Sequence, residues 1–409
     1  MPNEPGEPGT RSKIVVIGTG YVGLPAALMW ARSGHLVVGV DIRENLVKAI
    51  NDRTLLVDEQ ELNDLLADPV VQSNISARTE PCEGDVFVIA VPTPVDAQRK
   101  VADLSYVESS IRSIAPHLKP GNLVVIESTI PPLTTRGLVA GLLEELTGLS
   151  VPEDIKLAHC PERILPGDIF REIVENDRLI GGVDETSTKA ARELYSAFVT
   201  GEMVATDDVS AELAKLMENT YRDVNIALAN ELSLICEDAG VDAAEVIALA
   251  NRHPRVSILA PGIGVGGHCI PVDPWFLKEI APYHSRLITT ARLVNDDMPS
   301  RIAAKIRRSL SDCHSRRLPR IVAFGATYKK DCEDIRESPA LEIVALLERD
   351  GYDVTHVDPL VPAMAYDDLG ALLTDCDLAV VLVAHRAMTD ELRALEADHP
   401  ATRFLYFDA

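Results

Sequence analysis

The chain alternates short runs of β-branched residues with longer segments of helical pattern. Lys13–Ile17 ends at Gly18, and the helix-compatible segment Val22–Arg32 follows it. Similar apolar runs, which we predict to be strands, occur at His35–Val40, Asp85–Val91, Asn122–Glu127 and Ile155–Ala158. Continuous apolar strands separated by helices indicate a parallel sheet that is covered on both faces. We therefore predict a doubly wound α/β domain over residues 13–205.

The pattern changes in the middle of the chain. Residues 209–239 contain no Pro or Gly and carry apolar residues at helical spacing, at Leu213, Leu216, Met217, Val224, Leu228 and Leu232. This length exceeds that of a typical helix, and such a helix spans between domains or packs against a copy of itself. Strand and helix patterns return at Arg320–Phe324, Tyr352–Val357 and Leu378–Ala384. The chain is thus predicted to form two Rossmann-like doubly wound parallel-sheet domains of the α/β class, joined by a long central helix. The second covers residues 301–409, and residues 206–300 form a central helical domain between them.

Composition and charge restrict the class of protein. The chain has 409 residues, of which 46% are hydrophobic and 25% charged, as in ordinary globular proteins. The formal net charge of −24 argues against general binding to nucleic acid or to an anionic membrane. The longest apolar runs are far below the ~20 residues of a membrane span. Residues 1–12 are rich in Pro, Gly and acidic residues, and we expect them to be a disordered tail.

The seven cysteines are scattered and form no CxxC pair or metal-ligand spacing. We therefore expect no metal site. Cysteines in this arrangement are typical of a reduced compartment, so the predicted location is the cytoplasm.

The segment between the first strand and helix has the pattern GxGxxG. Glycines in this pattern permit the tight turn, the approach of a pyrophosphate and close packing of the helix on the strand. The candidate cofactor-binding residues here are Gly18, Gly20, Tyr21, Val22 and Gly23.

Asp41 lies 23 residues after Gly18, at the end of the next predicted strand. A carboxylate there accepts hydrogen bonds from a ribose 2′-hydroxyl and repels a 2′-phosphate, which favours NAD over NADP. Arg43 is close enough in sequence to accept a 2′-phosphate, so it leaves NADP as an alternative.

Three polar residues follow predicted parallel strands. Thr93, Thr129 and Glu162 would all lie at the carboxyl edge of the sheet, where ligands bind. The two threonines either contact cofactor or substrate or only cap their turns. Glu162 is a candidate base, with an ordinary surface glutamate as the alternative.

Two further features carry possible chemistry. Lys215 and Asn219 are four residues apart on the predicted long helix, so they share one face, where they either act on one ligand oxygen or are solvated. Cys269 follows four glycines within six residues, Gly262, Gly264, Gly266 and Gly267. Such glycines bring backbone close to a ligand, which favours a nucleophilic thiol over a buried, inert one.

These motifs together resemble one family, the nucleotide-sugar 6-dehydrogenases that include UDP-glucose and GDP-mannose dehydrogenases. The resemblance runs from about Lys13 to the C-terminus. It rests on the motifs GTGYVGL, VPTP, EST, CPE, the Lys215–Asn219 helix, GGHC with Asp273, and YKKDCEDIRESPA.

The resemblance implies a role for each matching residue. It implies that Cys269 is the catalytic thiol, that Lys215 and Asn219 stabilise an oxyanion, that Asp273 organises water near the thiol, and that Glu162 is the base of thioester hydrolysis. For the substrate, it implies that Lys329 and Arg336 hold the nucleotide end and that Arg255 reaches a partner subunit's site, with Arg163 and Gly266 as further candidates. The implied reaction is a four-electron oxidation of a C6 alcohol to a carboxylate.

Departures from the family's pattern narrow the implied substrate. UDP-glucose enzymes commonly have a Glu and a Lys where this chain has Pro166 and Val272. The segments PERILPG, RHPR and GHCIPVDPWF instead resemble the branch that oxidises UDP-N-acetylhexosamines, with UDP-N-acetyl-D-mannosamine favoured over UDP-N-acetylglucosamine and UDP-glucose.

Two more remote alternatives for the function are a two-electron dehydrogenase of the hydroxyacid type and a non-catalytic NAD-binding sensor.

The apolar length of the central helix predicts a homodimer, most simply with C2 symmetry.

Overall fold

The computed structural model describes residues 11–54, 60–96, 98–163, 169–310 and 319–407. Most of the predicted tail, residues 1–10, lies outside this range. The chain forms two compact units that divide between Leu216 and Met217. The domain boundaries at residues 205 and 300 therefore stay predictions.

The first unit contains an eight-stranded sheet in the order β3-β2-β1-β4-β5-β6-β7-β8. The strands are β1 (Lys13–Ile17), β2 (Leu36–Val40), β3 (Ile75–Arg78), β4 (Val86–Ile89), β5 (Leu123–Ile126), β6 (Lys156–His159), β7 (Arg178–Gly182) and β8 (Met203–Asp207). The order of the first six is that of a dinucleotide-binding sheet. All pairs are parallel except β6 with β7, which is antiparallel, and the predicted doubly wound parallel-sheet domain is confirmed. The segment RLIGG of β7 offers too few apolar residues to be recognised as a strand.

Helices cover both faces of this sheet, because alternate residues of each strand point to opposite sides. Ile14 and Val16 pack with one set of helices, and Val15 and Ile17 pack with the other. On the first face lie α1 (Gly23–Arg32), α2 (Glu44–Asp52), α3 (Gln60–Ala67), α4 (Pro69–Asn74), α7 (Ile169–Glu175) and α8 (Glu185–Tyr195). The second face carries α5 (Ser105–Ile114) and α6 (Ala140–Thr147), with the short helices η1 (Ala115–His117) and η2 (Thr135–Val139) beside them.

The predicted long helix is present as α9 (Asp208–Ala239). Its buried face is largely polar and includes Asp208, Glu212, Lys215, Thr220, Asp223 and Asn230. Several of its large apolar residues are exposed instead, namely Leu213, Met217, Tyr221, Leu228 and Ile235. The periodicity thus predicted the helix correctly. Of the six residues that carried it, Leu216 is buried, Val224 and Leu232 are half-buried, and Leu213, Met217 and Leu228 are exposed.

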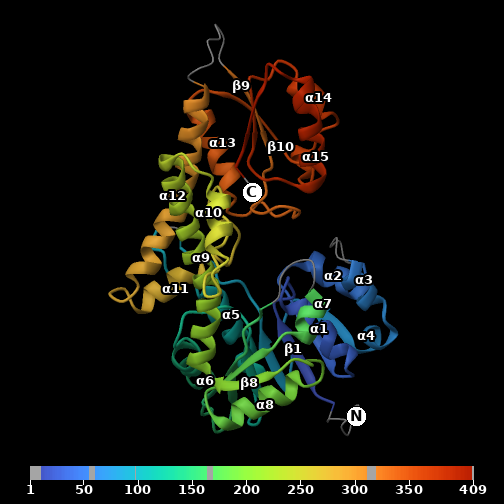
Figure 1. The fold of residues 1–409 in the computed structure, drawn as a ribbon. Coiled ribbons are helices and arrows are strands. Elements are labelled where there is room, and N and C mark those ends of the chain that lie inside the picture. The colour runs from blue at the N-terminus through green and yellow to red at the C-terminus, as the bar shows by residue number, and fades with distance from the viewer. Residues whose placement is uncertain (1–10, 55–59, 97, 164–168, 311–318, 408–409) are drawn as a thin grey trace. The chain divides into compact units, whose positions relative to one another are not determined.

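The second unit contains a four-stranded parallel sheet in the order β10-β9-β11-β12. Its strands are β9 (Arg320–Phe324), β10 (Asp353–Val357), β11 (Leu378–Val381) and β12 (Arg403–Tyr406). The helices α12 (Arg286–Leu310) and α13 (Pro339–Arg349) pack on one face, and α14 (Leu369–Leu373) and α15 (Arg386–Leu395) pack on the other (Figure 1). Two short helices, η3 (Pro362–Met364) and η4 (Glu396–Asp398), complete this part. The second predicted doubly wound sheet is therefore confirmed.

The predicted glycine-rich loop lies between two short helices of the same unit, α10 (Ala243–Ala250) and α11 (Asp273–Ile280). Residues 251–272 form turns, bends and irregular backbone there. No helix in the part of the chain that the structure describes is long and apolar enough to cross a membrane.

Glu212 provides a test of the buried polar face of α9. Its carboxylate accepts hydrogen bonds from the backbone N–H groups of Leu133 (2.7 Å) and Thr135 (2.9 Å), and burial raises its pKa to about 7. Between pH 4.5 and 7 the folded protein holds a proton that the unfolded chain has released, so this group lowers stability as the pH rises. The wild type should therefore lose stability relative to Glu212→Gln as the pH rises. We expect its unfolding free energy, minus that of the variant, to fall by roughly 2 to 3 kcal/mol from pH 5 to pH 8.

The measurement is denaturant unfolding across that pH range, with the exposed Glu231→Gln on the same helix as the matched control. A difference that does not change with pH would contradict the raised pKa of Glu212.

Candidate functional site

The glycine-rich turn after β1 has room for a ligand at one position only. Gly18 has a φ of +89°, and a Cβ there would lie 2.5 Å from the Ala90 carbonyl oxygen. At Gly23 a Cβ would lie 2.0 Å from the Gly18 carbonyl oxygen, so both glycines are required by the protein's own packing. At Gly20 the nearest atom is Nη2 of Arg43, at 3.8 Å. The turn therefore fits a pyrophosphate approaching the backbone at Gly20.

Asp41 is buried at the end of β2, next to this turn. It accepts hydrogen bonds from the backbone N–H of Thr19 (3.1 Å) and from Nε (2.9 Å) and Nη2 (3.0 Å) of Arg43. Burial opposes the charge of Asp41, but these hydrogen bonds outweigh it and lower the pKa. Asp41 is thus an ionised carboxylate that already engages the guanidinium of Arg43, and this pairing opposes a 2′-phosphate at the same place.

The two predicted threonines do meet. The hydroxyl of Thr93, after β4, donates a hydrogen bond of 2.5 Å to the carbonyl oxygen of Thr129, after β5. Both side chains are half-buried. The contact fixes two loops at the carboxyl edge of the sheet, as predicted for neighbouring parallel strands.

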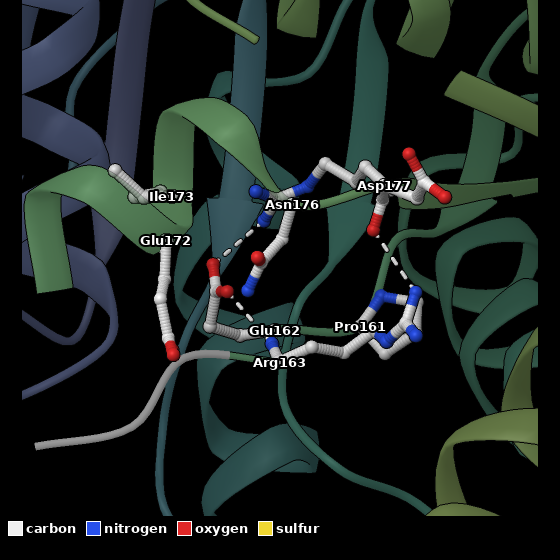
Figure 2. Close-up of a pocket in the computed structure, with 8 residues that line it drawn as sticks. Pro161, Glu162, Arg163, Glu172, Ile173, Asn176 and Asp177 are labelled. Atoms are coloured by element: carbon white, nitrogen blue, oxygen red, sulfur yellow. Dashed lines mark hydrogen bonds and ion pairs between the residues drawn. The ribbon is translucent and has the colours of Figure 1, made fainter. Parts of the chain in front are cut away.

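Glu162 is held in place by two donors. Nη2 of Arg178 donates to its Oε2 (2.7 Å), and the backbone N–H of Arg163 donates to its Oε1 (2.7 Å). Arg163 itself reaches the carbonyl oxygen of Asp177 at 2.9 Å. Figure 2 shows Glu162 and Asn176 among the residues that line a pocket of about 10 Å³, about the space that one water molecule needs. Glu162 is therefore an oriented carboxylate, not a freely solvated one.

Lys215 and Asn219 lie one turn apart on α9, as predicted. Lys215 is buried, and it interacts electrostatically with His159 at the end of β6. Burial, with a smaller contribution from the charge of Lys215, lowers the pKa of His159 to about 3. Neither ring nitrogen of His159 has a hydrogen-bond partner among the described residues. Lys215 thus has a neutral imidazole as one of its neighbours.

Three of the predicted residues of the second unit are linked to one another. The carbonyl oxygen of Cys269 accepts hydrogen bonds from the backbone N–H groups of Val272 (3.0 Å) and Asp273 (2.9 Å). Asp273 begins α11, and its buried carboxylate accepts a hydrogen bond of 2.6 Å from Nδ2 of Asn219. The half-buried thiol of Cys269 lies 2.9 Å from Nδ1 of His268. Cys269, Asp273 and Asn219 therefore form one connected arrangement.

The glycines before Cys269 are explained by packing within the protein. A Cβ on Gly266 would lie 2.5 Å from the carbonyl oxygen of Glu337 and 2.8 Å from Cβ of Tyr328. A Cβ on Gly264 would lie 3.1 Å from Pro339, and a Cβ on Gly267 would lie 3.0 Å from the ring of Tyr328. The segment YKKDCEDIRESPA therefore occupies the space that we expected a ligand to use. Gly266 as a substrate-binding residue stays a prediction.

The predicted cations of this unit differ in their surroundings. Arg336 pairs with both carboxylate oxygens of Asp334 and interacts electrostatically with Cys269. Lys329 is exposed on the same segment. Arg255 is exposed on the loop and contacts His253. Of the three, Arg336 is the one that the structure brings close to the thiol.

Sequence reasoning missed a set of buried residues around Glu162. Arg178 and Tyr195 each donate a hydrogen bond to Glu127, and all three residues are almost fully buried. Glu127 stands in the EST motif, which was the one available signal. Arg178 and Tyr195 lie in β7 and α8, far away in sequence, so nothing local marked them. Among the described residues, no group of His, Cys, Asp and Glu side chains is placed to hold a metal ion.

The whole chain matches one protein family in three consecutive parts. Residues 12–199 match the NAD binding domain of the UDP-glucose/GDP-mannose dehydrogenase family. Its central domain matches residues 209–297, and its UDP binding domain matches residues 322–407.

Individual relatives match over most of their length. A UDP-N-acetyl-D-mannosamine dehydrogenase of Methanocaldococcus jannaschii is 45% identical over 382 residues, covering 92% of this chain and 86% of the relative. An NDP-N-acetyl-D-galactosaminuronic acid dehydrogenase of Ralstonia solanacearum is 44% identical over 95% of this chain and 94% of its own length. The solved structure of a UDP-D-ManNAc dehydrogenase from Pyrococcus horikoshii superposes with a TM-score of 0.91 at 40% identity, covering 97% of this chain and 95% of that one.

Gly266→Ala tests whether packing requires this glycine. Because the new Cβ would meet backbone and a ring-bearing residue, we expect a loss of about 1–3 kcal/mol in stability. Gly262→Ala is the matched control, since its Cβ would find its nearest neighbour at 3.9 Å. Calorimetric melting of both variants is the measurement. Equal melting temperatures for the two would show that packing does not require Gly266.

Proposed function

The chain belongs to the UDP-glucose/GDP-mannose dehydrogenase family and is an NAD-dependent nucleotide-sugar dehydrogenase, and we propose that it oxidises C6 of UDP-N-acetyl-D-mannosamine to the carboxylate. The main support for this substrate is the 45% identity, over 92% of this chain, to a relative named UDP-N-acetyl-D-mannosamine dehydrogenase. Pro166 and Val272, which depart from the UDP-glucose pattern, support it. The Ralstonia relative favours a second candidate of the same class, a nucleotide-linked N-acetylgalactosamine.

In this proposal, the cofactor lies along the carboxyl edge of the first sheet. The backbone at Gly20 receives the pyrophosphate, with Gly18 and Gly23 shaping the turn and Tyr21 and Val22 continuing it. Asp41 binds the adenine ribose, and its bond to Arg43 keeps that arginine from a 2′-phosphate. Thr93 and Thr129 border the same edge. NAD, when bound, accepts hydride from C6 in each of the two oxidations.

The residues of the chain supply nucleophile and charge. The ammonium of Lys215 and the amide of Asn219 stabilise the negative charge that develops on the C6 oxygen, each worth roughly 2.7–4 kcal/mol if it acts as an oxyanion donor does. The thiolate of Cys269 adds to the aldehyde carbon and forms a thiohemiacetal, which the second oxidation converts to a thioester. Asp273 orients Asn219 through the 2.6 Å hydrogen bond and organises water beside the thiol.

Hydrolysis of the thioester completes the reaction. Glu162 accepts a proton from water while the water oxygen attacks the thioester carbon, and the carbon–sulfur bond breaks to release the Cys269 thiolate. This step requires Glu162 and Cys269 to reach the same substrate carbon. The room for one water beside Glu162 supports its role as the base.

In this proposal, cationic side chains and loop backbone bind the nucleotide and sugar parts of the substrate. We assign the diphosphate to Arg336 and Lys329, with Arg163 and the backbone at Gly266 beside the sugar. Arg255 serves a partner subunit. The described cysteines are free thiols, which supports a reduced, cytoplasmic setting for this chemistry.

The proposed homodimer uses the exposed stripe of α9. Tyr221, Leu228 and Ile235 are spaced seven residues apart, so they share one face of the helix, and they are 59%, 54% and 62% exposed. Large apolar side chains in such a row are typical of a helix that packs against another helix. A second copy of the chain is the proposed partner.

A panel of sugar nucleotides tests the substrate. We expect kcat/KM for UDP-N-acetyl-D-mannosamine to exceed that for UDP-N-acetylglucosamine, UDP-N-acetylgalactosamine and UDP-glucose by at least about tenfold, as a site built to bond the substrate's polar groups discriminates. NADH formation at limiting cofactor is the measurement. A higher kcat/KM for UDP-glucose would overturn the proposal.

Counting NADH tests the role of Cys269. The wild type is expected to release two NADH per sugar, and Cys269→Ala should lose the second while cofactor and substrate still bind. A slow first oxidation is expected to remain in this variant, with the aldehyde trapped by hydroxylamine, because Lys215 and Asn219 are intact. Two NADH per sugar at the wild-type rate in Cys269→Ala would mean that the thiol is not the nucleophile.

Light scattering tests the dimer. The wild type should be dimeric at micromolar concentration, and Leu228→Glu should shift it towards monomer because the charge would be buried in the interface. Lys48→Gln, on α2 of the first unit, is the control, because it changes the net charge by one, as Leu228→Glu does, at another exposed position. A monomeric wild type with full activity is the result that excludes this dimer.

A further inference from the structure

Behind Glu162 lies a buried cluster that contains one cation and two carboxylates. Nη2 of Arg178 donates to Oε2 of Glu162 at 2.7 Å and to Oε1 of Glu127 at 3.0 Å. The side chains of Arg178, Glu162 and Glu127 are 5%, 8% and 0% exposed. A single nitrogen atom is thus shared between the two carboxylates.

The side of the cluster away from Glu162 is fixed by aromatic packing. The hydroxyl of Tyr195 donates a hydrogen bond of 2.6 Å to Oε1 of Glu127, and the guanidinium of Arg178 lies 4.2 Å from the centre of the Tyr195 ring. Tyr195 in turn packs against Trp30 and Phe198. Glu162, in contrast, stands on the loop beside the small pocket of Figure 2. The carboxylate of Glu162 is therefore held on one oxygen by this packed cluster, through Arg178, and on the other by the backbone N–H of Arg163.

A purely structural role explains this cluster poorly. Two carboxylates and one guanidinium leave one excess negative charge in a buried place, and apolar residues of similar volume usually stabilise a core as well. Burial accordingly raises the pKa of Glu127 to about 7, with Arg178 opposing the rise and Glu162 adding to it. The other titratable neighbours stay neutral, because burial raises the pKa of Tyr195 far above its usual value and that of Cys160 to about 12.

We propose that Arg178 is a positioning residue for Glu162, and that Glu127, by competing for the same guanidinium nitrogen, sets how strongly Glu162 attracts a proton. The proposal rests on the proposed function, in which Glu162 takes a proton from the water that hydrolyses the Cys269 thioester. When Glu127 is protonated, Arg178 serves Glu162 alone and favours its ionised form. When Glu127 is ionised, it repels the charge on Glu162 and shares Nη2, so Glu162 becomes the stronger base.

The first test follows the thioester itself. Each variant is mixed with NAD and UDP-N-acetyl-D-mannosamine, quenched with acid, and examined by mass spectrometry for an acyl group on Cys269. Arg178→Lys should accumulate this adduct, as Glu162→Gln should. It should lose at least about tenfold in kcat, with KM falling in parallel and kcat/KM unchanged, since a misplaced base slows only the hydrolysis that follows adduct formation. The control is Arg171→Lys, which changes an exposed arginine paired with Glu175 on α7 and should behave as wild type.

The second test uses Glu127→Gln, which keeps the shape of the side chain and removes its titration. In single turnover, decay of the wild-type adduct should quicken as the pH rises through about 7, following the pKa of Glu127. The same rise should be absent in Glu127→Gln. This variant decides the matter if Arg178→Lys does not fold.

The outcomes separate this proposal from the function on which it rests. If Glu162→Gln accumulates the adduct but folded Arg178→Lys does not, or if Glu127→Gln keeps the rise near pH 7, the positioning role is wrong and the function stands. If neither Glu162→Gln nor the wild type ever carries an acyl group on Cys269, the proposed function itself is wrong.

Discussion

The polar face that α9 turns to the core is the constraint from which the rest of the structure follows. A buried polar group without a partner costs about 1–3 kcal/mol, so such a face fixes whatever it contacts. Glu212 holds the backbone of the loop after β5. Further along, Asn230 accepts a hydrogen bond of 2.8 Å from the backbone N–H of Gly262, where the loop to Cys269 begins. Lys215 and Asn219 lie between these two residues in the sequence of α9, four positions apart.

The Cys269 loop is held in a different way, because its glycine backbone packs directly against the segment that contains Arg336. Gly264 and Gly266 leave out the Cβ atoms that would meet Pro339 and Glu337, and the backbone N–H of Gly267 donates to the carbonyl oxygen of Arg336 at 3.1 Å. The segment around Arg336 therefore supports the loop.

Sequence reasoning succeeded where the signal was local. The run KIVVI, the GxGxxG turn and Asp41 are each read from a few neighbouring residues, and the structure has strand, turn and carboxylate where they predict them. It failed where partners are distant, because Arg178 and Glu127 are 51 residues apart and nothing in either segment refers to the other. The glycines before Cys269 were recognised as unusual for the right steric reason, but their neighbour is Tyr328 of the same chain.

The strongly acidic composition raises the question of how the chain attracts anionic nucleotides, and the ion pairs give part of the answer. Arg43 is bound to Asp41, Arg178 to Glu127 and Glu162, and Arg336 to Asp334. A ligand phosphate at any of these cations must compete with a carboxylate that is already in place. Backbone N–H groups are donors whose number does not depend on net charge. In the glycine-rich turn the N–H of Thr19 already donates to Asp41, whereas at Gly20 the nearest atom to an added Cβ is 3.8 Å away. The open position at Gly20 is therefore the part of the structure best suited to hold a diphosphate against the field of the whole protein.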